Sequence, residues 1–324
     1  MGKGSFVLRD RQFLNDHFKC IEYDVQLTKQ PFQFGWRLIK FTIYIFIHVP
    51  QVDLIYTWFT DYHSPILTLC ATIFRKSVYR VIGGYEVESI PELKYGGLQN
   101  PIRKRAILFS LNRAAQLLAV SEYTREKAKE YISHNRIQVV HNGIDTQTFV
   151  NKNITQERSY FLTVGYINNI QKLRIKGIHR FIQMAEYLKH EKFIIVGVSD
   201  AIRDQLLDTL PGNVSLEPSV SSSRLLDFYY KSKYYVQLSE VESFGVAVLE
   251  ALSCGAIPII SNRGALPMLF GKCSIVVDIN RFDCEIKFLP EKMDSFSLDV
   301  EKNQKLIKKH DIQNRYIALR KILQ

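Results

Sequence analysis

Residues 234–277 constrain the fold of this chain more than any other stretch. They predict an apolar strand over 234–238, an acidic turn, a helix that opens near Phe244, and a second apolar strand over 256–260. A glycine turn at Gly264 follows the second strand. Strand, loop, helix and strand in this order are typical of an α/β protein with a parallel sheet.

Two glutamates flank the predicted opening of this helix. Glu242 lies in the loop before it, and Glu250 lies roughly 9 Å along the helix axis, because each residue adds about 1.5 Å. They are too far apart for a coupled acid/base pair and would contact opposite ends of a ligand at the helix entrance. The amides of Phe244, Gly245 and Val246 suit an anion such as a diphosphate, and Gly245 allows a close approach to the backbone. The alternative is an ordinary αβ unit with two solvated glutamates.

The sequence around the two glutamates resembles a known family. Glu242-Ser243-Phe244-Gly245, followed by residues 249–260, is similar to the nucleotide-sugar signature of the retaining family 4 glycosyltransferases of GT-B fold. The resemblance implies that Glu242 contacts the donor sugar and that Glu250 binds the ribose hydroxyls. It implies that the diphosphate is held by the backbone of Ser243, Phe244, Gly245 and Val246.

Two cations precede another predicted helix. An apolar strand over 160–165 ends in glycine, and after a polar loop Arg174 and Lys176 stand before Gly177. Cations at this position could neutralise a departing diphosphate. Lys176 and Gly177 match the Lys-Gly pair of the resembled family. Tyr166 occupies the place of its usual arginine, so Arg174 is expected to replace that arginine. A solvated loop is the alternative.

His63 is the candidate from the first half of the chain. A predicted strand over 52–57 leads into the polar cluster 58–64, and ligand sites of open α/β sheets lie beyond the carboxyl ends of strands. We expect His63 to hydrogen-bond the donor sugar or the acceptor. Many members of the resembled family have a histidine where this chain has Gly83, which leaves His63 as the nearby candidate. Tyr85 and Glu86 could supply the polar contacts instead. The alternative is a histidine that caps the helix after Pro65.

The N-terminal residues predict a glycine turn followed by an amphipathic helix within 1–18 and a strand over 20–25. In the resembled family such a glycine loop follows a first strand and faces the donor diphosphate, which makes Gly4 a donor-binding candidate. No such strand precedes the loop in this sequence, so we expect either that the true start lies upstream or that the first sheet is one strand short. A flexible glycine-rich start is the alternative.

The predicted fold class is α/β, with the GT-B arrangement of two Rossmann-like, doubly wound parallel-sheet domains that face each other across a cleft. The resemblance contributes the GT-B part of this prediction. Residues 1–155 are expected to form an acceptor-side domain and 156–300 a nucleotide-sugar-binding domain. A basic amphipathic helix, residues 301–324, is expected to cross back to the first domain.

Composition limits the chemistry. The 324 residues are 46% hydrophobic and carry a formal net charge of +11, which suits a globular protein with an anionic ligand or surface but shows no nucleic-acid patch. Five cysteines without a C-x-x-C pair argue against zinc and disulfides. No D-x-D pair stands at a strand end, so no metal and no other cofactor are expected.

The expected location is cytoplasmic, because the longest hydrophobic run, residues 41–49, is too short to cross a membrane. Residues 34–48 favour a core helix, and a helix on a membrane surface is the alternative. Peripheral membrane contact therefore stays open.

These observations predict a retaining glycosyltransferase that moves a sugar from a nucleotide-activated donor to a glycan or lipid-linked acceptor. The expected catalytic residues are Lys176, Glu242 and His63. A nucleotide-sugar epimerase, a phosphorylase of the same fold, and a catalytically silent binding subunit are the alternatives. A dinucleotide dehydrogenase is disfavoured, because no G-x-G-x-x-G follows a predicted strand.

Overall fold

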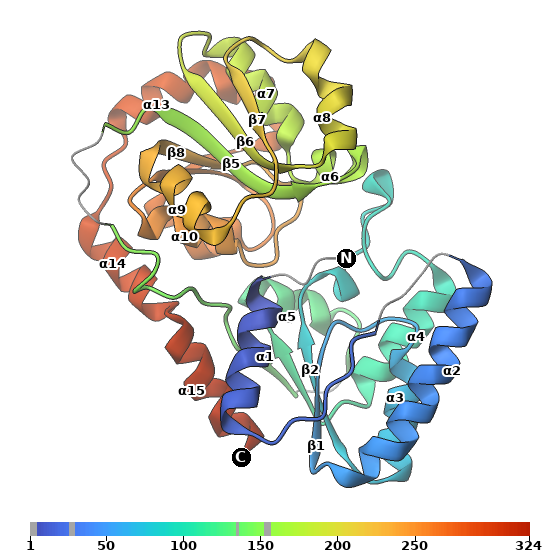
Figure 1. Ribbon diagram of the computed structural model, residues 1–324. Helices are drawn as coiled ribbons and strands as arrows, with labels where there is room; N and C mark the ends of the chain where they lie inside the picture. The colour runs from blue at the N-terminus through green and yellow to red at the C-terminus, as the bar shows by residue number, and fades with distance from the viewer. Residues whose placement is uncertain (1–4, 26–29, 134–135, 152–156) are drawn as a thin grey trace. The chain divides into compact units, whose positions relative to one another are not determined.

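The computed structural model describes the whole chain except residues 1–4, 26–29, 134–135 and 152–156. The chain divides into two compact units (Figure 1). The first comprises Met1–His141 together with Arg315–Gln324, and the second comprises Asn142–Asn314. The predicted boundary between 155 and 156 lies outside the described residues, and the division seen in the structure comes after His141.

The first unit is built on a parallel four-stranded sheet in the order β1-β2-β3-β4. Its strands are β1 (Leu54–Trp58), β2 (Ser77–Ile82), β3 (Gln116–Ala119) and β4 (Ile137–Val139). Its helices are α1 (Ser5–His17), α2 (Pro31–His48), α3 (Ser64–Ile73), α4 (Pro101–Asn112), α5 (Glu122–Lys129) and most of α15 (Ile312–Leu323). Within this unit, α2, α3 and α4 lie on one side of the sheet, and α1 and α15 lie on the other (Figure 1).

The predicted N-terminal helix is confirmed as α1, and a buried aspartate fixes it to the sheet. The carboxylate of Asp10 accepts hydrogen bonds from the Tyr56 hydroxyl at 2.6 Å and from Trp58 Nε1 at 2.8 Å. It also accepts two bonds from the Arg315 guanidinium, from Nε and Nη2, each at 2.7 Å. Both charged side chains are buried. The bidentate pair links α1 to α15, and its contacts with Tyr56 and Trp58 attach both helices to strand β1.

The predicted strand over 20–25 is wrong. This segment is irregular and packs against α2: the Tyr23 ring lies 5.3 Å from Phe41 and 4.5 Å from Tyr44, and the Tyr44 hydroxyl donates to the Glu22 carbonyl. Contacts with a helix therefore hold this segment without strand pairing, and Ile21 and Tyr23 each stay 41% exposed.

The prediction of a core helix over 34–48 is half right. One side of α2 packs on α3, where Phe41 and Ile45 join Leu67 and Cys70 in a buried cluster. The other side of α2 exposes large apolar side chains to solvent.

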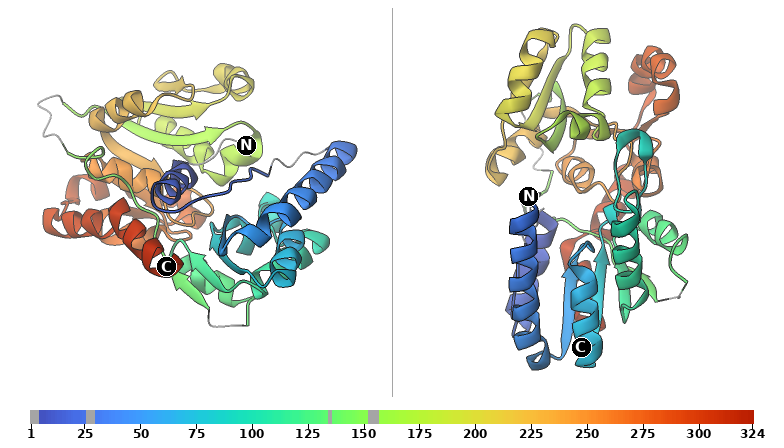
Figure 2. Two further views of the ribbon diagram at one scale, coloured as in Figure 1. Left: turned by 60° about the horizontal axis from the view of Figure 1, so that its bottom comes forward. Right: turned by 90° about the vertical axis from the view of Figure 1, so that its right-hand side faces the viewer.

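The second unit contains a parallel six-stranded sheet in the order β10-β9-β8-β5-β6-β7. Its strands are β5 (Tyr160–Ile167), β6 (Lys192–Val198), β7 (Val214–Glu217), β8 (Ser232–Gln237), β9 (Ile257–Ser261) and β10 (Ile275–Val277). Its helices are α6 (Ile170–Ile175), α7 (Ile178–Tyr187), α8 (Asp200–Leu206), α9 (Ser222–Lys231), α10 (Val246–Ser253), α11 (Leu266–Phe270), α12 (Phe282–Glu285), α13 (Leu289–Ser295) and α14 (Val300–Lys309). The helices cover both faces of the sheet, as in a doubly wound Rossmann-like fold (Figure 2).

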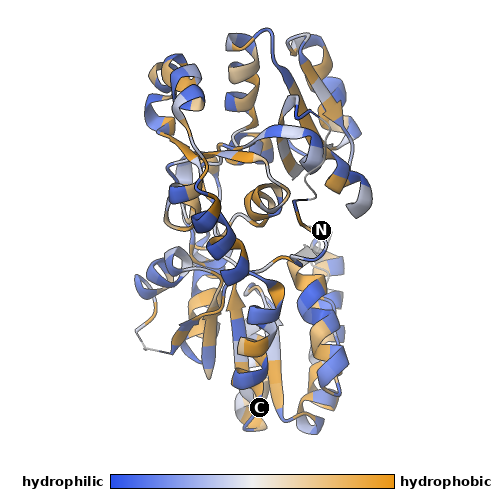
Figure 3. Ribbon diagram, turned by 90° about the vertical axis from the view of Figure 1, so that its left-hand side faces the viewer, coloured by the Kyte–Doolittle hydropathy of each residue, from blue (hydrophilic) through white to orange (hydrophobic). Residues whose placement is uncertain are grey.

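The core of the second unit lies between its sheet and its helices. Phe161 on β5 stacks on Phe193 of β6 and on Tyr234 of β8, at ring distances of 4.6 and 4.8 Å. Phe181 of α7 meets Phe193 edge-on at 5.1 Å. The strands carry long hydrophobic stretches, whereas hydrophobic and hydrophilic residues alternate along most helices (Figure 3). That alternation is expected of helices that bury one face only.

The single helix predicted over 301–324 is wrong, because the chain breaks between α14 and α15. The Ile144 amide donates to the His310 carbonyl at 3.1 Å, and the Ile312 amide donates to the Ile144 carbonyl at 2.8 Å. Because the His310 carbonyl and the Ile312 amide both pair with Ile144, they do not take part in the hydrogen bonds of a continuous helix. Gly143 allows the close approach, since a Cβ there would lie 2.8 Å from the Ile312 Cα.

Candidate functional site

The strand order of the second unit marks where a ligand site is expected. The chain winds from β5 through β6 to β7 in one direction and from β8 through β9 to β10 in the other. The order therefore reverses between the neighbouring strands β5 and β8, and ligands of open α/β sheets bind beyond the carboxyl ends of strands at such a switch point. The segment after β5 leads to Lys176, and the segment after β8 leads to Glu242.

Lys176 is positioned by close backbone packing. It ends α6 and precedes Gly177, which has a φ of 71°. A Cβ at Gly177 would lie 1.9 Å from the Leu238 carbonyl oxygen, so only glycine fits. The Glu240 amide donates to the Ile175 carbonyl at 2.8 Å and holds the end of α6 against the segment after β8.

Lys176 and Glu242 form an ion pair at this point. Lys176 Nζ donates to Glu242 Oε2 at 2.9 Å, and Gln237 Nε2 donates to the same oxygen at 3.1 Å. The Glu242 backbone is fixed from behind by the Ala265 amide, which donates to its carbonyl at 2.8 Å. Gly264, with a φ of 59°, permits this contact. Lys176 and Gln237 thus orient the Glu242 carboxylate, and the segment at Ala265 fixes its backbone.

The helix entrance predicted at 244–246 is confirmed as the start of α10. Gly245 is its N-cap residue, with a φ of 95°, and the first amides of the helix have no acceptor within it. The Phe244 side chain is buried, with ring contacts to His310 at 5.5 Å and to Phe270 at 6.5 Å. Phe244 therefore anchors the loop by its ring, and only its backbone could meet a ligand. Ser243 is half-buried beside it.

Glu250 lies inside α10 and is buried. Its Oε2 accepts a hydrogen bond from the Tyr229 hydroxyl at 3.1 Å. Burial, and then the charge of Glu250, raise the pKa of Tyr229 well above its ordinary value, so this tyrosine stays a donor. Tyr235 in turn donates to Gln237 Oε1 at 2.9 Å, and Gln237 reaches Glu242. Buried polar groups of α9 and β8 thus support both glutamates.

Lys172 is a cation of this region that the sequence prediction missed. It stands one helical turn before Lys176, and its Nζ lies 4.8 Å from the centre of the Tyr166 ring. Burial, and then the charge of Lys176, lower the pKa of Lys172. Arg174 is exposed, and its position between the two lysines turns it to another side of α6. The i, i+4 spacing of the lysines is the signal that could have identified Lys172.

His63 belongs to the first unit, where it is the N-cap residue of α3. Its side chain makes no capping hydrogen bond. Its ring meets Phe41 edge-on at 5.7 Å, and its Nδ1 is buried without a hydrogen-bond partner among the described residues. Burial lowers the pKa of His63 to about 4, with Asp61 acting against this shift and Arg80 adding to it. The imidazole is therefore neutral at pH 7. Gly4 lies outside the described residues.

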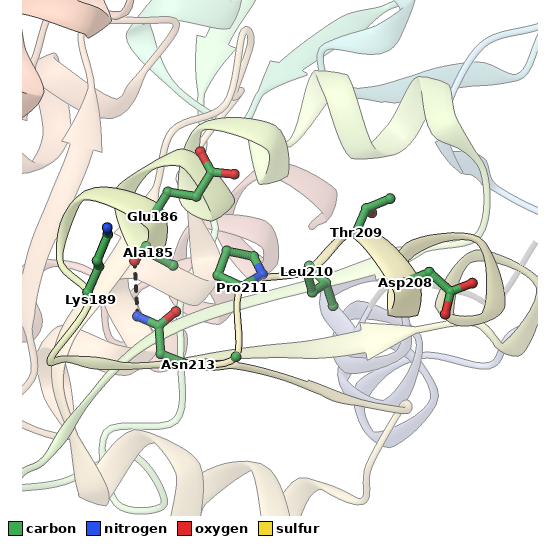
Figure 4. A pocket seen from close by; sticks show the side chains of 9 residues that line it. Ala185, Glu186, Lys189, Asp208, Thr209, Leu210, Pro211 and Asn213 are labelled. Carbon is green, nitrogen blue, oxygen red and sulfur yellow. Dashed lines mark hydrogen bonds between the residues drawn. The ribbon is translucent and has the colours of Figure 1, made fainter.

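A hollow of about 720 Å³ lies away from these residues, where β6 and β7 begin (Figure 4). Asn213 lines the hollow, and its side-chain amide donates to the carbonyls of Ala185, Leu188 and Glu191. These bonds give Asn213 a role in joining α7 to the sheet. The hollow lies at the amino ends of β6 and β7, whereas Lys176 and Glu242 follow the carboxyl ends of β5 and β8.

Comparison with known families identifies the chain. The family model described as glycosyl transferases group 1 matches residues 147–311, and the model described as glycosyltransferase family 4 matches residues 10–148. The chain belongs to the group 1 glycosyl transferases. The family that the sequence signature predicts is thereby confirmed.

Two curated relatives of this glycosyl transferase are similar over about half of its length. A GDP-mannose:cellobiosyl-diphosphopolyprenol alpha-mannosyltransferase of Xanthomonas oryzae pv. oryzae is 28% identical over 176 residues, which cover 52% of this chain and 45% of that protein. A D-inositol 3-phosphate glycosyltransferase of Mycobacteroides abscessus is 27% identical over 165 residues, covering 45% of this chain and 37% of the other. The chain thus spans less than half of the length of either relative.

Solved structures with the same fold cover nearly all of this glycosyl transferase. A sucrose-phosphate synthase from Thermosynechococcus elongatus matches with a TM-score of 0.74 at 16% identity, over 99% of this chain and 93% of the other. The Anabaena protein HepE in complex with UDP-glucose matches with a TM-score of 0.70 at 14% identity, over 97% and 88%. The predicted GT-B fold class, with two Rossmann-like parallel-sheet units, is confirmed.

Two negative findings hold for the described residues of this glycosyl transferase. Among its described residues, no group of three or more His, Cys, Asp or Glu side chains could hold a metal ion. Likewise, none of the helices that the structure describes is both long and apolar enough to cross a membrane.

Proposed function

We propose that this protein transfers a sugar from a nucleoside-diphosphate donor to a glycan or lipid-linked acceptor, with retention of configuration. The observation that carries the proposal is the Lys176–Glu242 pair at the switch point of the second unit, beside the entrance of α10. A cation and a helix N-terminus suit a diphosphate, and a fixed carboxylate suits the hydroxyls of a sugar. Retention is what membership of the resembled family implies.

The donor would lie along the entrance of α10. Its diphosphate would receive hydrogen bonds from the backbone of residues 243–246, while Glu250 would accept from the ribose hydroxyls. The contact with Tyr229 supports this role, because the tyrosine hydroxyl fixes the direction of the buried carboxylate, whose oxygens act as acceptors. Lys172, rather than the exposed Arg174, would serve as the second cation near the diphosphate.

The chemistry follows from where charge develops. As the bond between sugar and diphosphate breaks, the sugar becomes oxocarbenium-like and negative charge grows on the leaving oxygens. Lys176 and the α10 amides would stabilise those oxygens, and Glu242 would hold the sugar. The acceptor hydroxyl would attack from the face that the diphosphate leaves and pass its proton to the departing phosphate. No separate base and no metal ion is needed for this step.

His63 would contribute from the first unit as a neutral hydrogen-bonding group toward the sugar or the acceptor. Its low pKa supports this role, because a neutral imidazole can both donate and accept a hydrogen bond. The partnerless Nδ1 also supports it, since a buried polar nitrogen without a partner is costly unless a ligand satisfies it.

A lipid-linked acceptor is supported by the relative from Xanthomonas oryzae pv. oryzae, which is a cellobiosyl-diphosphopolyprenol alpha-mannosyltransferase. Mass spectrometry of a panel of nucleotide sugars, incubated with the protein with and without acceptor extracts, tests the proposal. We expect release of nucleoside diphosphate from one donor, and stimulation by an acceptor.

Other outcomes of the same experiment would replace the proposal. A change of donor without any acceptor would indicate an epimerase, and turnover that requires inorganic phosphate would indicate a phosphorylase. Binding of a donor without turnover under any condition would indicate a silent binding subunit.

A further inference from the structure

Helix α2 carries a continuous stripe of large apolar side chains that face solvent. They recur at intervals of three and four residues, which places them on one side of the helix. The stripe consists of Phe32, Trp36, Ile39, Ile43, Phe46 and Ile47, with exposed fractions between 45% and 88%. It runs for about 22 Å along the axis, at about 1.5 Å per residue. An exposed apolar surface of this extent marks an interaction site.

The stripe is held rigidly by the opposite side of the same helix. Phe41, Ile45 and Val49 are buried against Leu67 and Cys70 of α3. The helix is thus apolar on two sides, one facing the core of its unit and one facing outward. Packing within the first unit explains the first side only.

The apolar surface extends from α2 toward α3. The ring of Phe46 lies 6.0 Å from that of Phe74, which follows α3. On α3 itself Leu69 and Ile73 are also exposed, at 53% and 63%. Because α2 forms the outer layer of its unit, this surface is open to a large, flat partner (Figure 2).

The charges of the two helices favour an anionic partner. Arg37 and Lys40 lie on α2, and the Lys40 ammonium stands 5.4 Å from the centre of the Trp36 ring. Arg75 and Lys76 follow α3. Neither α2 nor α3 contains an aspartate or a glutamate.

This charge pattern distinguishes a lipid surface from a second copy of the chain. In a two-fold dimer through α2, the same face would meet itself, so Arg37 and Lys40 would approach their own copies without a carboxylate from α2 or α3 to pair with. Lipid phosphates bring negative charges to these cations, and acyl chains cover the apolar stripe. Tryptophan beside lysine is also typical of the membrane–water boundary.

We propose that α2 docks the protein on an anionic membrane surface. The helix lies along the surface, with the stripe of Phe32, Trp36, Ile39, Ile43, Phe46 and Ile47 inserted between headgroups and with Arg37 and Lys40 against phosphates. The proposal is independent of the reaction, because it involves neither Lys176 nor Glu242.

Vesicle flotation tests the proposal with the full chain and without donor or acceptor. We expect the protein to bind phosphatidylcholine vesicles that contain phosphatidylglycerol. The double variant Ile39→Ser/Ile43→Ser is expected to lower the partition coefficient by about tenfold or more, since two apolar anchors are lost. Arg37→Gln/Lys40→Gln is expected to weaken binding to the anionic vesicles and to remove its salt dependence. Ile317→Ser is the matched control, because Ile317 is 67% exposed on α15 of the same unit.

A second measurement locates the contact. Brominated phospholipids should quench the tryptophan emission of the wild-type protein, and Trp36→Phe should abolish most of this quenching. Circular dichroism confirms that each variant folds. The proposal is overturned if the wild-type protein does not bind anionic vesicles, or if Ile317→Ser weakens binding as much as the double variant. It is also overturned if Ile39→Ser/Ile43→Ser dissociates a dimer in sedimentation while vesicle binding is absent.

Discussion

Lys176 Nζ and Glu242 Oε2 are 2.9 Å apart, although 66 positions separate the two residues in sequence. The pair joins the segments that follow β5 and β8, the two strands between which the sheet order reverses. In the proposed reaction the ammonium is shared between Glu242 and the oxygens of the leaving diphosphate. The ion pair thus orients the cation before charge develops, which is how preorganised groups contribute most to catalysis.

Replacement of Lys176 tests this role. Lys176→Ala should lower turnover by about 100-fold or more, as expected for the loss of one group that stabilises a leaving oxyanion. Steady-state release of nucleoside diphosphate measures the effect. Lys189→Ala is the matched control, because Lys189 lies at the hollow where β6 begins (Figure 4). Activity of the folded Lys176→Ala protein within a few-fold of wild type would show that the diphosphate binds elsewhere.

The backbone beneath Lys176 gives a prediction about stability. Gly177→Ala should lower the free energy of unfolding by about 2 kcal/mol or more, because alanine disfavours its positive φ. The new Cβ would also clash with the Leu238 carbonyl. Urea denaturation measures the change. Gly212→Ala in the same unit meets no atom within 4 Å and should change stability by less than about 0.5 kcal/mol. Equal effects of the two substitutions would contradict the prediction.

Strong local patterns made much of the second unit predictable. The predicted strands over 234–238 and 256–260 are confirmed as Ser232–Gln237 and Ile257–Ser261, and the helix opening near Phe244 starts at Val246. Short apolar runs separated by glycine turns give these elements an unambiguous pattern. The two glutamates were also found from the sequence, because they lie within one such unit.

Features that depend on distant contacts were not predictable in the same way. The break between α14 and α15 depends on pairing with Ile144, which no periodicity within 299–323 reveals. The Lys176–Glu242 pair and the support of Glu250 by Tyr229 likewise join separate segments. Asp10 is different: it falls on the apolar side of α1, and that position is a sequence signal of a buried partner.

Replacement of His63 tests whether it acts in sugar transfer and not in nucleotide binding. His63→Ala should leave the affinity for nucleoside diphosphate unchanged and depress transfer to the acceptor. Calorimetry measures the first quantity and product formation the second. His190→Ala, at an exposed histidine of the second unit, is the control. If His63→Ala weakens nucleotide binding, or if it retains full transferase activity, His63 has only a structural role.

The low pKa of His63 also predicts how stability depends on pH. The folded state holds this pKa at about 4, below its ordinary value of 6.5, because burial disfavours the charged form. The unfolded state therefore binds the proton first as pH falls. The contribution of neutral His63 to the free energy of unfolding is fully present above pH 6.5 and is lost as pH falls from there to about 4. Between pH 7 and 5 wild type should lose about 2 kcal/mol more than His63→Gln in urea denaturation. Parallel losses in the two proteins would contradict this.

The buried ion pair of the first unit should be sensitive to loss of its cation. Arg315→Met leaves the carboxylate of Asp10 buried without its bidentate partner, which should lower the free energy of unfolding by about 3–5 kcal/mol. Arg320→Met, on the exposed side of the same helix, should change it by less than about 0.5 kcal/mol. Thermal denaturation compares the two. A small effect of Arg315→Met would show that Tyr56 and Trp58 alone satisfy Asp10.

The most direct measurement is calorimetric titration of nucleoside diphosphates, without any sugar or acceptor, into wild type, Glu250→Ala and Tyr229→Phe. The central claim is that the nucleotide lies along the entrance of α10 with its ribose against Glu250. Glu250→Ala should therefore weaken the bound diphosphate by about 1–3 kcal/mol, the value of a hydrogen bond to a charged group. Tyr229→Phe, which retains the carboxylate, should weaken it less. Unchanged affinity in a folded Glu250→Ala protein would contradict the account and would remove the nucleotide from this site.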